Sequence, residues 1–268
     1  DKIRWDEEDP RRASFKILNP LGEDTSIMRT TVLPSMLEIL TRNYNYRNKS
    51  AKLYEIGRTY GFGGEQGLAI ERKVLSIGAY GPDMDFFALK GVIEAALSEI
   101  RATDIRFEGC RDNPSYHPGR CAKVYCGDAY LGVFGQIHPL VAKNYDVDAA
   151  FYCAELSFDA LFAARGDDPV YQPLPKFPAV TRDIAVVCDK AIPVGALENS
   201  IRRGAKGLLK EATLFDIYTG TGIPEGKKSV AFNLTLRADD RNLTAQEADE
   251  DVKNILSVLE AEHQAVLR

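Results

Sequence analysis

Hydrophobic and polar positions in the first 168 residues alternate in segments that predict a mixture of helices and strands. Apolar residues recur at helical spacing after Pro34 and over 89–100, and a shorter helix is predicted from Pro139 to about Tyr145. The strand-like runs are residues 28–33, 53–60, 74–80, 105–108, 123–126, 130–134 and 151–158. Gly127-Asp128 is typical of a hairpin turn between two of them. We therefore expect an α+β domain with a mostly antiparallel sheet.

The last hundred residues show a simpler pattern. Strands are predicted over 182–189, 212–218, 229–237 and 265–267. One helix is predicted to begin at Pro193, and another follows Thr244 and Glu247, which form a capping box. The resulting order, β-α-β-β-α-β, is that of a ferredoxin-like unit, in which both helices cover one face of a four-stranded sheet.

A proline-containing segment separates the two patterns. Prolines follow Gly166-Asp167-Asp168 at 169, 173, 175 and 178, and such a segment is stiff and extended. The length of 268 residues agrees with two domains, at roughly 150 residues per domain. We therefore expect one domain over 1–168 and a second over 169–268.

Alternation in the second domain also predicts which side chains face away from the helices. If the apolar residues of the third strand face the helices, Ser229 faces the uncovered side of the sheet. If Phe215 and Ile217 face the core, Asp216 and Tyr218 share that uncovered side. An aromatic ring beside a carboxylate and a hydroxyl suits a nucleobase, because the ring stacks and the polar groups bond to the base edge. A tyrosine without function at the rim of the sheet is the alternative interpretation.

Composition and charge narrow the class of protein. Apolar residues make up 45% and charged residues 27%, as in globular domains, which excludes a disordered tail, collagen and a coiled coil. The net charge of -5 argues against a strongly basic nucleic-acid-binding protein but permits local basic patches. We expect no membrane span, because no stretch reaches about 18 uninterrupted apolar residues. The chain does not begin with methionine, and we expect it to be part of a longer protein.

Cysteine and histidine offer a second kind of chemistry. The five cysteines form no Cys-x-x-Cys pair, so a reducing compartment is expected and no disulfide framework is predicted. His117, Cys121, Cys126 and His138 are ligand types for zinc, but their spacing fits no common zinc motif. A Cys–His nucleophile pair is a further alternative, although cysteine is most often a small buried hydrophobe. Packing is the favoured interpretation, and we expect neither a metal nor a catalytic residue in this chain.

Several motifs of the second domain resemble the ferredoxin-fold anticodon-binding domain that ends the β subunit of bacterial phenylalanine–tRNA ligases. They are FPAVTRDIA (177–185), LFDIY (214–218), GKKSVA (226–231), NLTAQE (242–247) and LR (267–268). Motifs of the first domain resemble the catalytic-like module of the same subunit. These are NPL (19–21), MRTTVLPSML (28–37), YEIGR (54–58), LKGVIE (89–94), HPGR (117–120) and GQIHP (135–139).

The resemblance implies that the second domain recognises the anticodon of its tRNA. The positions that match the anticodon contacts of the family are Asp216, Tyr218 and Ser229. Cations nearby are candidates for phosphate contacts, which position RNA without reading its sequence, and a solvated surface is the alternative for each. These candidates are Arg182, Arg202, Arg203, Lys206, Lys227, Lys228 and Arg237.

The resemblance also implies that the first domain is an inactive, N-terminally truncated class II synthetase-like module. Class II ligases hold ATP with arginines from two motifs. Here the matching regions read LYEIGRTY (53–60) and AELSFDAL (154–161), and the second contains no glycine and no arginine. No side chain there can pair bidentately with a triphosphate. We expect this domain to pack against the α subunit.

We therefore expect a non-catalytic C-terminal region of a phenylalanine–tRNA ligase β subunit. The partners implied by the resemblance are the α subunit, in an α2β2 ligase, and tRNA(Phe), with neither DNA nor a membrane. The expected location is the cytoplasm. ATP and Mg2+ are expected cofactors of the whole ligase, with none held by this chain. The alternative is a ferredoxin-like regulatory or dimerisation module that binds no RNA.

Overall fold

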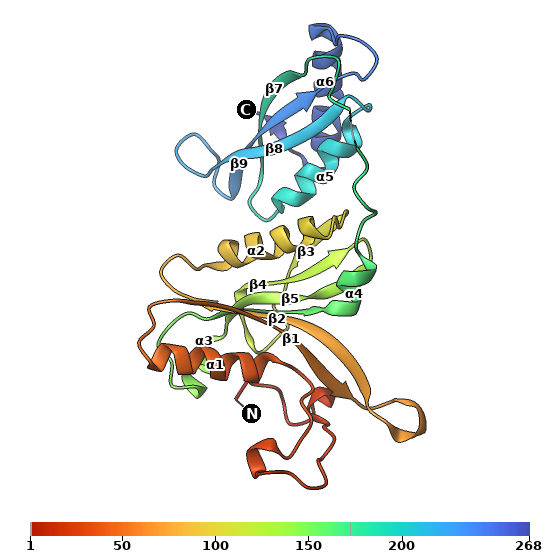
Figure 1. Cartoon of the computed structure of the whole chain (residues 1–268). Coiled ribbons are helices and arrows are strands. Elements are labelled where there is room, and N and C mark those ends of the chain that lie inside the picture. Colours follow the sequence, from red (N-terminus) through yellow and green to blue (C-terminus); the bar gives the residue numbers. More distant parts are fainter. Residues whose placement is uncertain (1, 172) are drawn as a thin grey trace. The chain divides into compact units, whose positions relative to one another are not determined.

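The chain forms two compact units, Asp1–Asp168 and Pro169–Arg268, which we call unit 1 and unit 2 (Figure 1). The structure, a computed structural model, describes residues 2–171 and 173–268. The boundary between the units falls in the segment where the sequence predicts a linker.

Unit 1 is built on a six-stranded sheet with the order β1-β2-β6-β5-β4-β3, in which all neighbouring strands are antiparallel. The strands are β1 (Ala51–Gly61), β2 (Ile70–Tyr80), β3 (Ile105–Gly109), β4 (Tyr116–Cys126), β5 (Ala129–Ile137) and β6 (Tyr152–Ser157). The predicted α+β class and antiparallel sheet are confirmed. Strand β4 begins earlier than predicted, because a register shift between Tyr116 and Cys121 carries the strand past Pro118 and Gly119.

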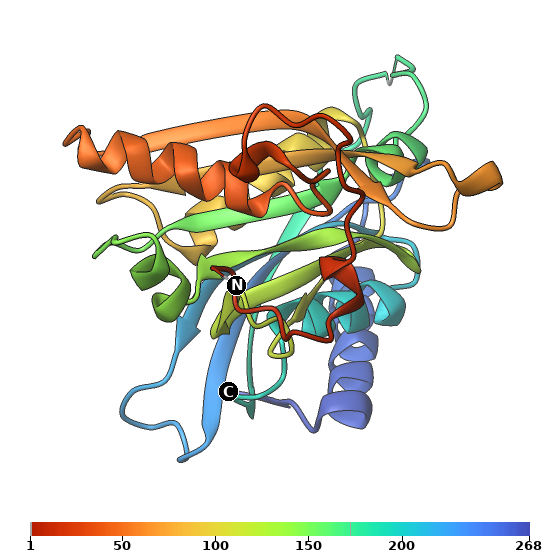
Figure 2. The same ribbon diagram turned by 90° about the horizontal axis from the view of Figure 1, so that it is seen from below.

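Helices cover both faces of this sheet (Figure 1). They are α1 (Leu33–Asn45), α2 (Phe86–Glu99), α3 (Pro139–Asn144) and α4 (Phe158–Ala163), with 3-10 turns η1 (Pro10–Arg12), η2 (Glu23–Thr25) and η3 (Glu65–Gly67). Buried residues such as Met36 of α1 and Val141 of α3 form one core, and Leu89 and Ile93 of α2 form the core of the other face. Figure 2 shows α1 lying along the sheet. Helix α4 was not predicted, because the apolar run 151–158 continues into it.

Unit 2 has the predicted β-α-β-β-α-β order. Its elements are β7 (Val180–Asp189), α5 (Val194–Gly204), β8 (Leu209–Tyr218), β9 (Lys227–Leu236), α6 (Ala245–His263) and β10 (Val266–Leu267). The sheet order is β10-β7-β9-β8, and all pairs are antiparallel. The capping box of Thr244 and Glu247 begins α6 as predicted.

Both helices of unit 2 pack on the same face of its sheet. Leu197 of α5 and Ile255 of α6 share one core with Phe232 of β9. The helices approach closely at Gly204, where a Cβ would lie 2.8 Å from the Cα of Ile255. We call the opposite side of the sheet the open face.

Candidate nucleic-acid interface

Ser229 and Tyr218 lie side by side on the open face. Val230 and Phe232 are fully buried toward the helices, so Ser229, which alternates with them on β9, points the other way. Ser229 pairs with Tyr218 of β8 and with Val187 of β7. Directly paired residues of antiparallel strands share a face. The register therefore places both side chains on the open face, as the sequence predicts.

A bulge in β8 brings Asp216 to the open face and also turns Phe215 outward. Leu214 pairs with the buried Phe232, whereas Asp216 pairs with Ala231, which lies on the open face, and Phe215 is the extra residue between the pairs. The expectation that Phe215 faces the core is wrong, since its side chain is 58% exposed. A hydrophobic alternation pattern does not reveal a bulge.

Ile217, the first residue after Asp216, again follows the ordinary alternation of the strand. Ile217 pairs with Val230 and therefore points to the helix side, as predicted, although it lies near the strand end and stays exposed.

The Tyr218 ring lies between Arg268 and the loop that joins β8 to β9. The Cζ atom of Arg268 is 5.5 Å from the ring centroid, and the Tyr218 hydroxyl donates to the carbonyl oxygen of Thr221 at 3.4 Å. Gly220 is so close that a Cβ there would lie 2.2 Å from the tyrosine hydroxyl oxygen. Tyr218 keeps 37% exposure and Ser229 only 3%. Arg268 belongs to the LR motif (267–268), but the sequence did not predict that it reaches Tyr218, because that contact depends on long-range strand pairing.

Two alanines form a low floor beside the tyrosine. Ala185 of β7 pairs with Ala231 of β9, which pairs with Asp216 of β8. The backbone N–H of Arg268 donates to the carbonyl oxygen of Ala185 at 2.8 Å and extends the same row across the sheet. The row therefore carries a cation at one end, a carboxylate at the other and only methyl groups between. With strands about 4.8 Å apart, its ends are about 14 Å apart at their Cα atoms.

Lys227 and Lys228 point to opposite sides of β9. Lys228 pairs with the buried Cys188, and its Nζ donates to the carbonyl oxygen of Ile192. Lys227 alternates with it and lies on the open face, two residues from Ser229. The structure brings Lys227 to the candidate site but directs Lys228 to the helix side.

Arg182 does not lie with the other candidates. It pairs in register with Leu234, whose side chain is fully buried toward the helices. Its Nε donates to Oδ1 of Asp249 on α6 at 2.8 Å. The alternation along β7 places Arg182 on the same side as Ile184, which faces the helices. Its hydrogen bond to Asp249 therefore fixes α6 to the sheet.

Arg237 also lies away from the tyrosine. It follows the end of β9 and is eight positions from Ser229, which is about 26 Å in an extended strand. Its Nε is buried and has no hydrogen-bond partner among the residues that the structure describes. The remaining candidate cations lie on or directly after α5. They are Arg202, Arg203, which pairs with Glu262, and Lys206.

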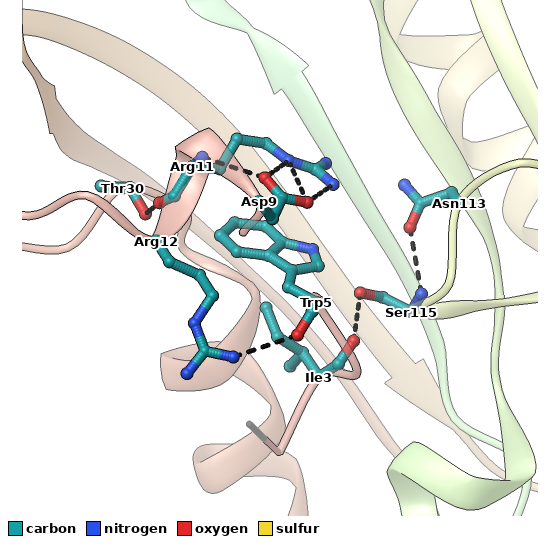
Figure 3. Close-up of polar contacts among 8 residues, drawn as sticks. All are labelled: Ile3, Trp5, Asp9, Arg11, Arg12, Thr30, Asn113 and Ser115. Carbon is teal, nitrogen blue, oxygen red and sulfur yellow. Dashed lines mark hydrogen bonds and ion pairs between the residues drawn. The ribbon is translucent and has the colours of Figure 1, made fainter. Parts of the chain in front are cut away.

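Unit 1 contains a cleft of about 340 Å³, lined in part by Trp5 and Arg11. The Cζ atom of Arg11 is 4.3 Å from the centroid of the Trp5 ring. Asp9 accepts hydrogen bonds from Nε of Arg11 at 2.9 Å and from Nη2 at 2.5 Å (Figure 3), and these bonds lower the pKa of Asp9 to about 2. The hydroxyl of Ser115 donates to the carbonyl oxygen of Ile3 at 2.7 Å and anchors the same segment. Arg11 is therefore engaged within the unit.

Glu155 lies in the segment 154–161, which the resemblance predicts to match the second ATP-binding motif of class II ligases. Its Oε1 accepts hydrogen bonds from the Thr31 hydroxyl at 2.7 Å, the Val32 N–H at 2.7 Å and the Leu33 N–H at 3.2 Å. The carboxylate thus caps α1, which begins at Leu33. The strand predicted over 28–33 is wrong, because residues 28–32 form no strand and Leu33 is helical. Burial raises the pKa of Glu155.

We expect Glu155→Gln to flatten the pH dependence of the stability of this chain. A raised pKa in the folded state means that ionisation costs more there than in the unfolded chain. The free energy of unfolding therefore falls as pH rises from the ordinary glutamate range through the folded-state pKa. Urea unfolding at pH 5 and pH 7.5 measures the change. The wild type should lose more stability between the two values than the variant, and equal losses would contradict this role.

The two candidate zinc histidines make local hydrogen bonds. His117 Nδ1 accepts from the Gly119 N–H at 3.0 Å, and His138 Nδ1 accepts from the Leu140 N–H at 3.1 Å. Within residues 2–171 and 173–268, no group of three or more His, Cys, Asp or Glu side chains is placed to hold a metal ion. Over the same ranges, no helix is long and apolar enough to cross a membrane.

Both units match known protein families. Residues 1–158 match the phenylalanyl tRNA synthetase beta chain CLM domain, and residues 175–268 match the ferredoxin-fold anticodon binding domain. A solved pyrrolysyl-tRNA synthetase from Desulfitobacterium hafniense aligns with 60% of this chain and 56% of its own, with a TM-score of 0.48 and 15% identity.

Relatives of known function match along almost the whole chain. The phenylalanine–tRNA ligase beta subunit of Clostridium tetani is 42% identical over 100% of this chain and 34% of its own length. The corresponding subunit of Bacillus subtilis is 36% identical over 93% of this chain and 32% of its own length. The chain thus spans about a third of the length of these relatives. The resemblance seen in the sequence motifs is confirmed, and the chain belongs to the family of phenylalanine–tRNA ligase β subunits.

Proposed function

We propose that unit 2 reads anticodon bases of tRNA(Phe) on its open face, and that unit 1 holds the α subunit of the ligase. The observation that carries the first part is the arrangement of Tyr218, Ser229 and Asp216 around the floor formed by Ala185 and Ala231. The match to an anticodon-binding domain supports RNA as the ligand and disfavours a regulatory or dimerisation module.

Each side chain of the arrangement has a distinct part in base binding. The Tyr218 ring supplies a stacking surface, which tolerates any base because every base has a π face. Asp216 accepts hydrogen bonds from N–H groups on the base edge, and Ser229 donates or accepts one. The alanine floor leaves room for a planar ring between them. Lys227 lies at the side of this site and contacts a phosphate, which positions the strand without reading it.

Unit 1 offers an apolar surface for another subunit. Tyr54 and Ile56 are 76% and 53% exposed on β1, which forms an edge of the sheet, and Tyr46 is exposed at the end of α1. Large apolar side chains on an edge strand are typical of protein interfaces. We assign this surface to the α subunit within an α2β2 ligase of the cytoplasm.

The chemistry of aminoacylation belongs to other parts of that ligase. In unit 1, Arg11 is paired with Asp9, and Glu155 caps a helix. ATP and Mg2+ are assigned to the α subunit, and this chain contributes no reacting group.

The proposal is tested first at Asp216. We expect Asp216→Asn in the assembled ligase to raise the Kd for tRNA(Phe) about 10-fold, because a hydrogen bond to a charged group loses its charge assistance. The amide keeps the size of the side chain, so the fold stays intact. Filter binding at fixed salt measures the change.

Arg182→Ala is the matched control for this experiment. Arg182 is also a charged strand residue of unit 2, but it lies on the helix side. Its loss should leave the Kd for tRNA unchanged. If both variants weaken binding equally, the effect reports on the fold of unit 2 and the assignment of the open face is wrong.

A further inference from the structure

We infer that Arg268 is the second wall of the base site, and that its guanidinium stacks on the face of the bound base opposite Tyr218. This inference rests on the proposed function of the open face. It adds a residue that contacts the base to the three that the motifs of the sequence indicate.

The position of Arg268 is set by the sheet and not by chance contact of a mobile side chain. Its backbone N–H donates to Ala185, so the residue is held at the row that also contains Ala231 and Asp216. From the far edge of the sheet, its side chain extends over the open face and brings Cζ to 5.5 Å from the Tyr218 ring centroid. Ser229, which lies between the two strands that carry these residues, is 3% exposed. Arg268 and Tyr218 therefore close over the site from opposite sides.

Arg268 differs from other arginines of unit 2 in what its guanidinium contacts. Arg182, Arg203 and Arg241 each form an ion pair with a carboxylate. Among the residues that the structure describes, Arg268 forms no such ion pair and rests on an aromatic ring. A planar cation on an aromatic face is an interaction that a nucleobase, itself a planar π system, can take over.

The distance between the Arg268 guanidinium and the Tyr218 ring shows what must change when a base binds between them. A base between the two groups needs about 3.5 Å on each side, or about 7 Å in total. The present distance of 5.5 Å is too short by about 1.5 Å, which rotation of the flexible arginine stem supplies. The tyrosine has less room to move, because the Gly220 backbone lies close to the hydroxyl end of its ring. Arg268 therefore moves when a base binds, whereas Tyr218 keeps its position.

The guanidinium of Arg268 is both planar and positively charged, and the inference requires the planar shape. Two variants of Arg268 separate these properties. Arg268→Ala removes both properties, whereas Arg268→Lys keeps the positive charge and removes the planar group. The Kd of the assembled ligase for tRNA(Phe) is measured for both variants at two salt concentrations, together with Tyr218→Ala, the double variant and the control Arg182→Ala.

We expect Arg268→Ala to raise the Kd about 3- to 30-fold. Arg268→Lys should recover less than half of that loss on a logarithmic scale, with the wild-type dependence on salt. In the double variant with Tyr218→Ala, the loss should be smaller than the product of the two single losses, because both residues contact the same base. Arg182→Ala should bind as the wild type does.

Three outcomes would overturn the inference while the proposed function stands. Wild-type affinity in Arg268→Lys would identify a phosphate contact, and tighter binding by Arg268→Ala would identify a lid that competes with the base. Unchanged affinity in Arg268→Ala, with a loss in Tyr218→Ala, would show that Arg268 takes no part. If Tyr218→Ala itself binds normally, the proposed function of the open face fails as well, so the two failures are distinguishable.

Discussion

Tyr218→Ala in the assembled ligase is expected to raise the Kd for tRNA(Phe) about 5- to 150-fold. One stacked base contributes about 1–3 kcal/mol, and this ring is the fixed stacking surface of the open face. Tyr218 pairs directly with the buried Ser229, so loss of the ring is expected to admit water beside that hydroxyl and to weaken its bond to the base. Filter binding or fluorescence anisotropy with labelled tRNA measures the change.

Tyr218→Phe is the control for this result. It keeps the ring and removes only a hydroxyl whose partner is the carbonyl oxygen of Thr221 at 3.4 Å, which is a long hydrogen bond. Its Kd should stay within about threefold of the wild-type value. A phenylalanine variant as weak as the alanine variant would mean that the hydroxyl, and not the ring, holds the RNA.

Phe232→Ala is expected to lower the free energy of unfolding of unit 2 by about 3–5 kcal/mol. The side chain is fully buried at the centre of the core that joins α5 and α6 to the sheet. Its removal leaves a cavity beneath β9, the strand that carries Ser229 and Ala231. Equilibrium urea unfolding measures the loss.

Phe215→Ala is the matched control for the core variant. It removes the same side chain from an exposed position on the bulge of β8, and its cost in stability should stay below about 1 kcal/mol. If the two variants destabilise the chain equally, Phe215 packs in a core and the bulge does not turn it outward.

The period of two along β8 and β9 was enough to place Asp216, Tyr218 and Ser229 on one face. The same reasoning failed at Phe215, because a bulge adds one residue and interrupts the alternation. Bulges depend on pairing with the neighbouring strand, which a single strand sequence does not encode.

The predicted phosphate contacts show a second limit of prediction from the sequence. They were chosen mainly by charge, and the alternation along the strands was not applied to Lys228 or Arg182. Lys228 and Arg182 alternate to the helix side, where their partners are Ile192 and Asp249. The position of Arg268 beside Tyr218 was not predicted, because it depends on how β10 joins the edge of the sheet, which is a long-range contact.

In unit 1, local patterns predicted the longer helices but not how the segments begin and end. Helix α4 begins where Ser157 accepts a hydrogen bond from the Ala160 N–H, in the middle of an apolar run. Helix α1 begins where Glu155, more than a hundred residues away, accepts from Leu33. Such helix boundaries are set by single polar contacts, which the hydrophobic pattern of the sequence does not reveal.

The most direct test of base reading by the open face compares the Kd of the assembled ligase for tRNA(Phe) and for the same tRNA with altered anticodon bases. The comparison is made for the wild type and for Tyr218→Ala at two salt concentrations, because phosphate contacts weaken with salt whatever the sequence. We predict that the wild type prefers the natural anticodon at both concentrations and that Tyr218→Ala loses most of this preference. An equal preference in the two proteins, or none in the wild type, would contradict the assignment of anticodon reading to unit 2.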